Sequence, residues 1–107
     1  MKDPNHKKNN VITKKNILKK LSKEKKYMQS MYGVEKIGIF GSYARDVATE
    51  ESDIDFYVEF KKNTFDNVSG LWVYLEELYG DKVDLLHRHK RSHGAIFDQI
   101  KQEVVYG

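Results

Sequence analysis

The sequence predicts an α/β domain in which one sheet carries its helices on one face. Two observations support this class: apolar residues recur at helical spacing in two long segments, and short apolar runs that read as strands follow each of them. The expected order is helix, strand, strand, helix, strand, helix, strand. We place the domain at residues 13–107, after a basic, disordered tail at residues 1–12.

The first helix is expected to begin near Thr13 and to stop at Gly33. Its lysines fall on one side and its apolar residues near the other, and these are Ile17, Leu18, Leu21, Met28 and Met31. The segment 35–40 (EKIGIF) then reads as a short strand that runs directly into Gly41-Ser42.

A second strand is predicted at 53–60 (DIDFYVEF), after a polar loop at 46–52. Side chains alternate between the two faces of a strand. One face should therefore carry the apolar set, and the other should carry Asp53, Asp55, Tyr57 and Glu59.

The remaining elements follow from the same signals. Thr64 is a typical N-cap for a second long helix, which Gly80 should end. Its apolar stripe reads as core rather than as a cofactor site. A third strand is expected at 82–87, and a third helix, with Ser92 as its cap, at 93–101. A last strand is expected within 103–106.

Charge is distributed unevenly along the chain. Residues 1–26 hold ten lysines and two acids, a balance of +8, whereas residues 27–107 hold nine basic and fourteen acidic residues, a balance of −5. The first segment could contact phosphates, but it reads more simply as a solvated helix face and tail, so we do not expect nucleic acid as a partner. The acidic remainder suits a metal site.

Composition limits the remaining classes. The chain has no cysteine, which excludes disulfides and thiolate metal sites and fits a cytoplasmic protein. It has no apolar run long enough for a membrane span, and its N-terminus lacks the pattern of a signal peptide. Only 39% of its residues are apolar, so its core is modest and self-association is compatible with it.

Three carboxylates are the candidate metal ligands and catalytic groups. Asp53 and Asp55 project from the same face of their strand. Two adjacent carboxylates repel each other, and a bound divalent cation would offset that repulsion. Asp84 stands between Val83 and Leu85, which should face the helices, so it points to the same open face as the other two. Oxygen ligands of this kind suit Mg²⁺ or Mn²⁺ and could hold two metals for an in-line phosphoryl transfer.

Gly41-Ser42 is the candidate phosphate site. Glycine allows a sharp turn that exposes backbone N–H groups to phosphate oxygens, and the serine hydroxyl adds a donor. Arg45 is a further candidate for a phosphate or leaving-group contact. Each part alone is weak evidence, because a Gly-Ser pair is usually only a turn and an Asp-x-Asp is usually a solvated strand.

Together these residues resemble a known family. "GSYARD…SDIDFYV" is similar to the GS-x10-DxD signature of the minimal nucleotidyltransferases (MNT) of the DNA polymerase β superfamily, with ten residues between Ser42 and Asp53. The resemblance covers nearly all of the chain from the first helix onward. One departure is Asp46, where the family commonly has glycine; aspartate tolerates a positive φ, but its charge could lower phosphate affinity.

The resemblance implies a palm-like fold with a single mixed sheet, ATP as donor and two Mg²⁺ ions, with Mn²⁺ as the alternative. By position, Gly41, Ser42 and Arg45 would bind the triphosphate, and Asp53, Asp55 and Asp84 would bind the metals. Relatives of this size are commonly paired with a HEPN-domain RNase toxin. The resemblance therefore implies an antitoxin that transfers AMP to a tyrosine of its HEPN partner.

Two other functions stay open. The chain could neutralise its partner by contact alone, with a vestigial site, or it could transfer nucleotides to a small molecule or a nucleic acid. A zinc site at His87, His89 and His93 is less favoured than a basic loop, in which Arg88, Lys90 and Arg91 could steer a nucleotide towards the site.

Overall fold

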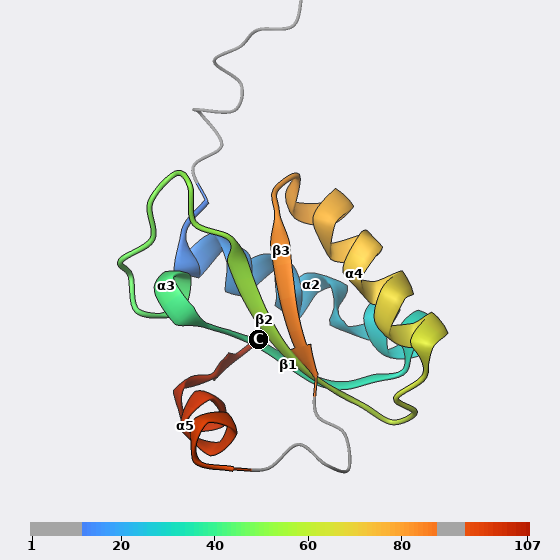
Figure 1. Ribbon diagram of the computed structural model, residues 1–107. Coiled ribbons are helices and arrows are strands. Elements are labelled where there is room, and N and C mark those ends of the chain that lie inside the picture. Colours follow the sequence, from blue (N-terminus) through green and yellow to red (C-terminus); the bar gives the residue numbers. More distant parts are fainter. Residues whose placement is uncertain (1–11, 88–93) are drawn as a thin grey trace, which may run out of the picture.

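The computed structural model describes residues 12–87 and 94–107, and it confirms the predicted fold class. Its sheet has four strands in the order β3-β2-β1-β4. Figure 1 shows their arrangement with the helices. In chain order the elements are α2 (Lys14–Tyr32), β1 (Val34–Phe40), α3 (Gly41–Ala44), β2 (Ile54–Phe60), α4 (Phe65–Tyr79), β3 (Val83–His87), α5 (Ala95–Glu103) and β4 (Val105–Tyr106).

The two long helices begin and end where the sequence predicts. The Thr13 hydroxyl accepts the Asn16 N–H at 3.1 Å, and the Thr64 hydroxyl accepts the Asn67 N–H at 3.1 Å. These bonds satisfy N–H groups that a first helical turn leaves without partners. At the other ends, Gly33 and Gly80 take the left-handed conformation, with φ of 66° and 63°.

The sheet is mixed because β2 pairs antiparallel with β1 and parallel with β3. The short strand β4 pairs antiparallel with β1, opposite Gly38 and Ile39. A Cβ atom at Gly38 would lie 2.8 Å from the Tyr106 Cα, so glycine is what lets β4 approach. The polypeptide after α5 therefore returns to the sheet as an edge strand beside β1.

The core lies between one face of the sheet and helices α2 and α4. Ile54, Phe56 and Val58 of β2 are fully buried there, as their alternation predicts. The Phe56 ring packs 5.5 Å from that of Tyr79 on α4. The α2 residues in this core are Ile17, Leu21 and Met28. The first helix thus uses the apolar stripe read from the sequence, except that Met31 is 55% exposed.

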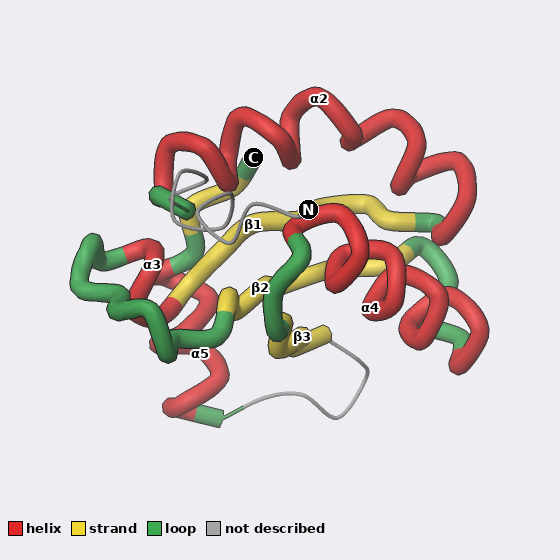
Figure 2. The backbone as a smooth tube through the Cα atoms, turned by 90° about the horizontal axis from the view of Figure 1, so that it is seen from above, coloured by secondary structure: helices red, strands yellow, loops and turns green. Residues whose placement is uncertain are grey.

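The third helix corrects one expectation. We expected all helices on one face, but α2 and α5 lie on opposite sides of the sheet (Figure 2). Phe97 of α5 packs 6.0 Å from Tyr57, which points away from the core of α2 and α4. Tyr57 is consequently fully buried rather than part of a solvated polar face, and its hydroxyl donates to Glu59 at 2.7 Å.

Element bounds differ slightly from those expected. The third helix runs over Ala95–Glu103 rather than 93–101, and Ser92, its expected cap, lies outside the described residues. The tail before residue 12 lies outside them too. Within the described parts of the chain, no helix has the length and apolar character required to cross a membrane.

Candidate active site

The Gly41-Ser42 segment forms a single helical turn, α3, where the sequence predicted only a turn. Strand β1 ends at Phe40, and the Arg45 N–H donates to the Gly41 carbonyl at 3.1 Å. The first N–H groups of a helix have no partner within that helix. The turn therefore aims the N–H groups of residues 41–43 away from its own backbone, as a phosphate site requires.

Gly41 lies directly against the carboxylate of Asp55. Its φ is 76°, a conformation that side chains other than glycine's rarely adopt. A Cβ atom added there would collide with Oδ2 of Asp55. The register of the sheet explains the contact, because Phe40 pairs with Asp55. The sequence motif thus brings a glycine backbone and an acidic side chain together across two antiparallel strands.

The three predicted aspartates lie at one end of the sheet. Asp55 is the register partner of Asp84 on the parallel strand β3, and Asp53 immediately precedes β2. Asp53 and Asp84 are exposed, whereas Asp55 is half-buried. Burial raises the pKa of Asp55 above its ordinary value, and the carboxylates of Asp84 and Asp53 raise it further, while Arg45 lowers it. Negative charge is thus concentrated at this point.

The residues present fit a hard divalent cation. All three offer carboxylate oxygens, and the raised pKa of Asp55 reflects first its burial and then repulsion from Asp84 and Asp53, which a cation would relieve. Within residues 12–87 and 94–107, however, no three such side chains already stand in a metal-binding arrangement. The Asp84 carboxylate instead accepts the N–H of Leu85 at 3.1 Å. Binding an ion would therefore draw carboxylates together that repel one another without it.

Arg45 follows α3 and lies near the carboxylates, since it affects the pKa of Asp55. Its Nη1 atom is 3.6 Å from Oε1 of Glu103, at the end of α5. We did not single out Glu103 from the sequence, because no local pattern indicates that the C-terminal helix returns to this face of the sheet.

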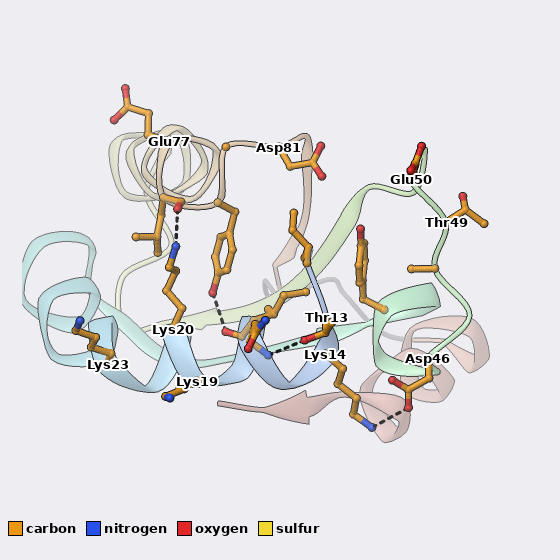
Figure 3. Close-up of a pocket in the computed structure, with 18 residues that line it drawn as sticks. Thr13, Lys14, Lys19, Lys20, Lys23, Asp46, Thr49, Glu50, Glu77 and Asp81 are labelled. Carbon is orange, nitrogen blue, oxygen red and sulfur yellow. Dashed lines mark hydrogen bonds and ion pairs between the residues drawn. The ribbon is translucent and has the colours of Figure 1, made fainter. Parts of the chain in front are cut away.

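Asp46, the departure from the family pattern, has the positive φ that we expected it to tolerate, at 60°. Its carboxylate lies 3.9 Å from the Lys14 ammonium, and Figure 3 shows the two side chains pointing toward one another. The extra negative charge is therefore partly neutralised by α2.

A broad groove of about 1490 Å³ lies beside α3 rather than at the aspartates. Its walls come from α2, the loop after α3 and the turn between α4 and β3 (Figure 3). Two hydrogen bonds tie α2 to α4 along it: Lys20 donates to the Leu78 carbonyl at 3.2 Å, and Tyr79 donates to the Ile17 carbonyl at 2.8 Å. The carboxylates are a better candidate for the reaction site than the groove is, because possible metal ligands and the N–H groups of α3 adjoin there.

Of the histidines considered for zinc, the structure describes only His87. It lies at the end of β3, where its ring packs 6.2 Å from that of Phe60. His89, His93 and the basic residues Arg88, Lys90 and Arg91 lie outside the described residues.

Comparisons with known proteins identify the family of the chain. The family model described as "Polymerase beta, Nucleotidyltransferase" matches residues 19–107. MJ1379 of Methanocaldococcus jannaschii, named as a candidate protein adenylyltransferase, is 40% identical over 89 residues, which cover 80% of this chain and 89% of that protein. The protein adenylyltransferase MntA of Thermococcus cleftensis is 37% identical over 97 residues, covering 90% and 97%.

Solved structures have the same fold. One described as a candidate minimal nucleotidyltransferase has a TM-score of 0.73 and 24% identity, covering 90% of this chain and 97% of its own. Another is a mutant of the toxin–antitoxin MntA–HpeT, with a TM-score of 0.54 and 25% identity, covering 90% of this chain and 72% of that one. The chain therefore belongs to the polymerase β nucleotidyltransferase family, and it is a nucleotidyltransferase similar in sequence to proteins named as protein adenylyltransferases.

Proposed function

We propose that this nucleotidyltransferase transfers AMP from ATP to a tyrosine hydroxyl of a partner protein, a HEPN RNase toxin, and so acts as its antitoxin. Two comparisons support the proposal. Relatives that it matches over nearly their whole length are named protein adenylyltransferases. A structure of similar fold is that of a toxin–antitoxin pair.

The observation that carries the proposal is the contact between Gly41 and Asp55. The contact sets the start of α3, with its N–H groups, beside the most strongly perturbed carboxylate of the domain. A phosphate donor site and a metal ligand must adjoin in this way if a triphosphate and its cation are to be held together. In this assignment Ser42 adds a hydroxyl donor, and Arg45 contributes positive charge.

Asp53, Asp55 and Asp84 would hold Mg²⁺, or Mn²⁺ in its place. The cation would neutralise the charge that develops on the phosphates. The acidic residues themselves keep the site negative until a cation arrives, so the nucleotide should bind as its magnesium complex.

The proposed reaction balances without a further reactant. The tyrosine oxygen attacks the α-phosphorus of ATP, the bond to the bridging oxygen of the β-phosphate breaks, and pyrophosphate leaves. The tyrosine proton passes to the Asp84 carboxylate, which is exposed and can reach an incoming hydroxyl. The N–H groups of α3 would stabilise the charge on the leaving phosphates.

A labelling experiment tests the proposal. The protein and the HEPN-domain toxin proposed as its partner are incubated with Mg²⁺ and with ATP labelled on its α-phosphate. We expect label on a tyrosine of the partner, and none with Asp53→Asn/Asp55→Asn. Glu35→Gln/Asp98→Asn is the matched control, since it removes two exposed carboxylates outside the site and should label normally.

Suppression of toxicity separates enzyme from binding module. If Asp53→Asn/Asp55→Asn still protects cells fully from the co-expressed partner, neutralisation is by contact. If the wild-type protein labels added RNA or a small hydroxyl compound but never the partner, the proposed acceptor is wrong although the chemistry stands.

A further inference from the structure

The outer surface of α2 and α4, on the side away from the sheet, has an aromatic seam. The two helices run antiparallel, because Lys20 meets Leu78 whereas Tyr32, further along α2, lies against Gly70, earlier in α4. Between them the rings of Tyr27 and Tyr74 lie 5.1 Å apart, and those of Tyr32 and Tyr74 lie 5.6 Å apart. The Tyr74 hydroxyl donates to Glu24 at 2.7 Å, which fixes the seam.

Apolar side chains beside this seam are exposed. Tyr27 is 45%, Met31 55% and Val73 54% exposed. Tyr27 and Met31 are one helical turn apart on α2, and Val73 adjoins Tyr74 on α4. Tyrosine and methionine are enriched at the centres of protein interfaces, where they supply large apolar contact areas.

The helix α2 carries a basic stripe beside the seam. Lys15, Lys19 and Lys23 follow one another at four-residue spacing, and the series continues into Tyr27 and Met31. All three lysines are exposed. Like charges at this spacing repel one another and destabilise a helix. Within the described residues, none of the three lysines forms an ion pair, so acidic groups from outside the chain would relieve this repulsion.

The helix α4 carries the opposite charge on the same outer surface. Asp66, Val73 and Glu77 recur at intervals of seven and four residues, which places them on one side of the helix, and all three are exposed. Glu76 adds a neighbouring exposed carboxylate. Figure 3 shows Glu77 and Lys19 on opposite walls of the groove, and they do not pair within one chain.

We propose that this outer surface of α2 and α4 binds a second copy of the chain in a symmetric dimer. The two-fold axis runs parallel to the seam, so that α2 of each copy lies across from α4 of the other. Each basic stripe then faces the acidic stripe that Glu76 and Glu77 form on the other copy, and the exposed Tyr27, Met31 and Val73 of both copies meet at the centre. A self-complementary patch of this kind is what a two-fold interface requires.

The charges on the two helices and their positions along the seam together select this axis. Along the direction of the two helices, Lys20 lies beside Leu78 and Tyr27 lies beside Tyr74. Glu77 therefore lies at the same position along the seam as Lys19 and Lys23. A two-fold rotation about an axis parallel to the seam keeps each residue at its position along the seam. It therefore sets Glu77 of the second copy opposite these lysines. A rotation about the perpendicular direction would instead set α2 against α2 and α4 against α4, so that the lysines of one copy would no longer face the carboxylates of the other.

The same pattern argues against other occupants. A nucleic acid would meet the carboxylates of α4, and a uniformly acidic protein would meet them too.

The available area also fits a dimer of modest affinity. A helix of nineteen residues is about 28 Å long, and two adjacent helices are about 20 Å wide, so each copy would bury roughly 550 Å². That total of about 1,100 Å² lies near the lower limit for a specific interface, and we expect micromolar association.

Analytical ultracentrifugation of the full chain over a range of concentrations tests the proposal. The monomer mass is 12.6 kDa, and we expect a concentration-dependent dimer that added salt weakens. Lys19→Glu/Lys23→Glu makes both stripes acidic, and Glu76→Lys/Glu77→Lys makes both basic. Each variant alone should self-associate at least about tenfold more weakly, because its two stripes now repel their counterparts.

Mixing the two variants gives the decisive result. Each stripe of one variant then faces an opposite charge on the other, so the mixture should form a dimer with close to wild-type affinity. A variant that had merely lost its fold would not be rescued in this way. Lys61→Glu/Lys62→Glu, which reverses two exposed lysines elsewhere, is the matched control and should dimerise normally.

Three outcomes would overturn the proposal. The wild-type chain could remain monomeric at several hundred micromolar, both reversed variants could dimerise as well as the wild type, or the mixture could fail to recover association. Both candidate active sites stay accessible in the proposed dimer, because Asp55 lies on the α5 side of β2 and α5 lies on the opposite side of the sheet from α2 (Figure 2).

Discussion

The two faces of strand β2 differ in what they contribute to the protein. Ile54, Phe56 and Val58 face α2 and α4 and are fully buried, so this face supplies stability. Asp55 faces the opposite side, where burial and neighbouring carboxylates raise its pKa, so this face holds charge that the fold does not neutralise. The apolar face thus stabilises a domain whose other face is under electrostatic repulsion.

Gly41→Val should have the largest effect, because it damages the charged face directly. The new side chain would collide with the Asp55 carboxylate and would strain a backbone at φ 76°. We expect complete loss of transfer and a loss of about 2–5 kcal/mol in unfolding free energy. Transfer assays and thermal melts measure the two effects.

Gly80→Val is its matched control. Gly80 has a similar φ of 63°, but no atom lies within 4 Å of an added Cβ, so this variant has the backbone strain alone. If both variants lost equal stability and Gly41→Val kept its activity, the close contact between Gly41 and the Asp55 carboxylate would not be needed for transfer.

Phe56→Ala tests the apolar face. Phe56 is fully buried and packs on Tyr79, so truncation should remove about 3–5 kcal/mol and lower the melting temperature by more than about 12 °C. Below its melting temperature the variant should still bind magnesium and ATP. Loss of binding by fully folded protein would mean that the two faces are not separable.

Ser42→Ala should affect activity without affecting stability. We expect kcat/KM to fall by roughly tenfold to a thousandfold, as removal of one transition-state donor does. The melting temperature should not change. Ser22→Ala, an exposed serine on α2, is the control. Wild-type activity for Ser42→Ala would refute its role as a phosphate donor.

Tyr79→Phe should have the smallest effect. The change removes the hydrogen bond that Tyr79 donates to the Ile17 carbonyl at 2.8 Å but keeps the ring against Phe56. We expect a loss of about 1 kcal/mol in denaturant unfolding and no change in transfer. Tyr106→Phe, at an exposed position, should show neither effect.

Local signals in the sequence were sufficient to predict most of the apolar face. Thr13 and Thr64 cap their helices, and Gly33 and Gly80 end them, because these effects depend only on nearby backbone. The alternation in β2 placed Asp55 and Phe56 on opposite faces for the same reason.

The charged face was predicted less completely, because it depends on distant contacts. A turn as short as α3 carries no periodic pattern, and no local signal shows that α5 covers Tyr57 or that Glu103 meets Arg45. The alternation of β3 did place Asp84 beside Asp55. The three carboxylates lie at one end of the sheet, but they do not stand in a metal-binding arrangement.

The repulsion on the charged face also predicts a dependence on pH. Because the pKa of Asp55 is raised, the folded protein holds this proton more tightly than the unfolded chain does. Its contribution therefore favours folding at low pH and is lost as pH rises through the folded pKa. Asp55→Asn should be more stable than the wild type at neutral pH, and the difference should vanish below the ordinary value of 3.8.

The most direct test of the account is the melting temperature of wild-type protein and Asp55→Asn at neutral pH, each with and without Mg²⁺. Without metal, we predict that Asp55→Asn melts a few degrees higher, because it removes a crowded, half-buried charge. Mg²⁺ should stabilise the wild type and have little effect on the variant. Glu35→Gln should behave as the wild type in both conditions. If Asp55→Asn melts lower than the wild type, or if Mg²⁺ stabilises both equally, the charged face is not the metal-binding site.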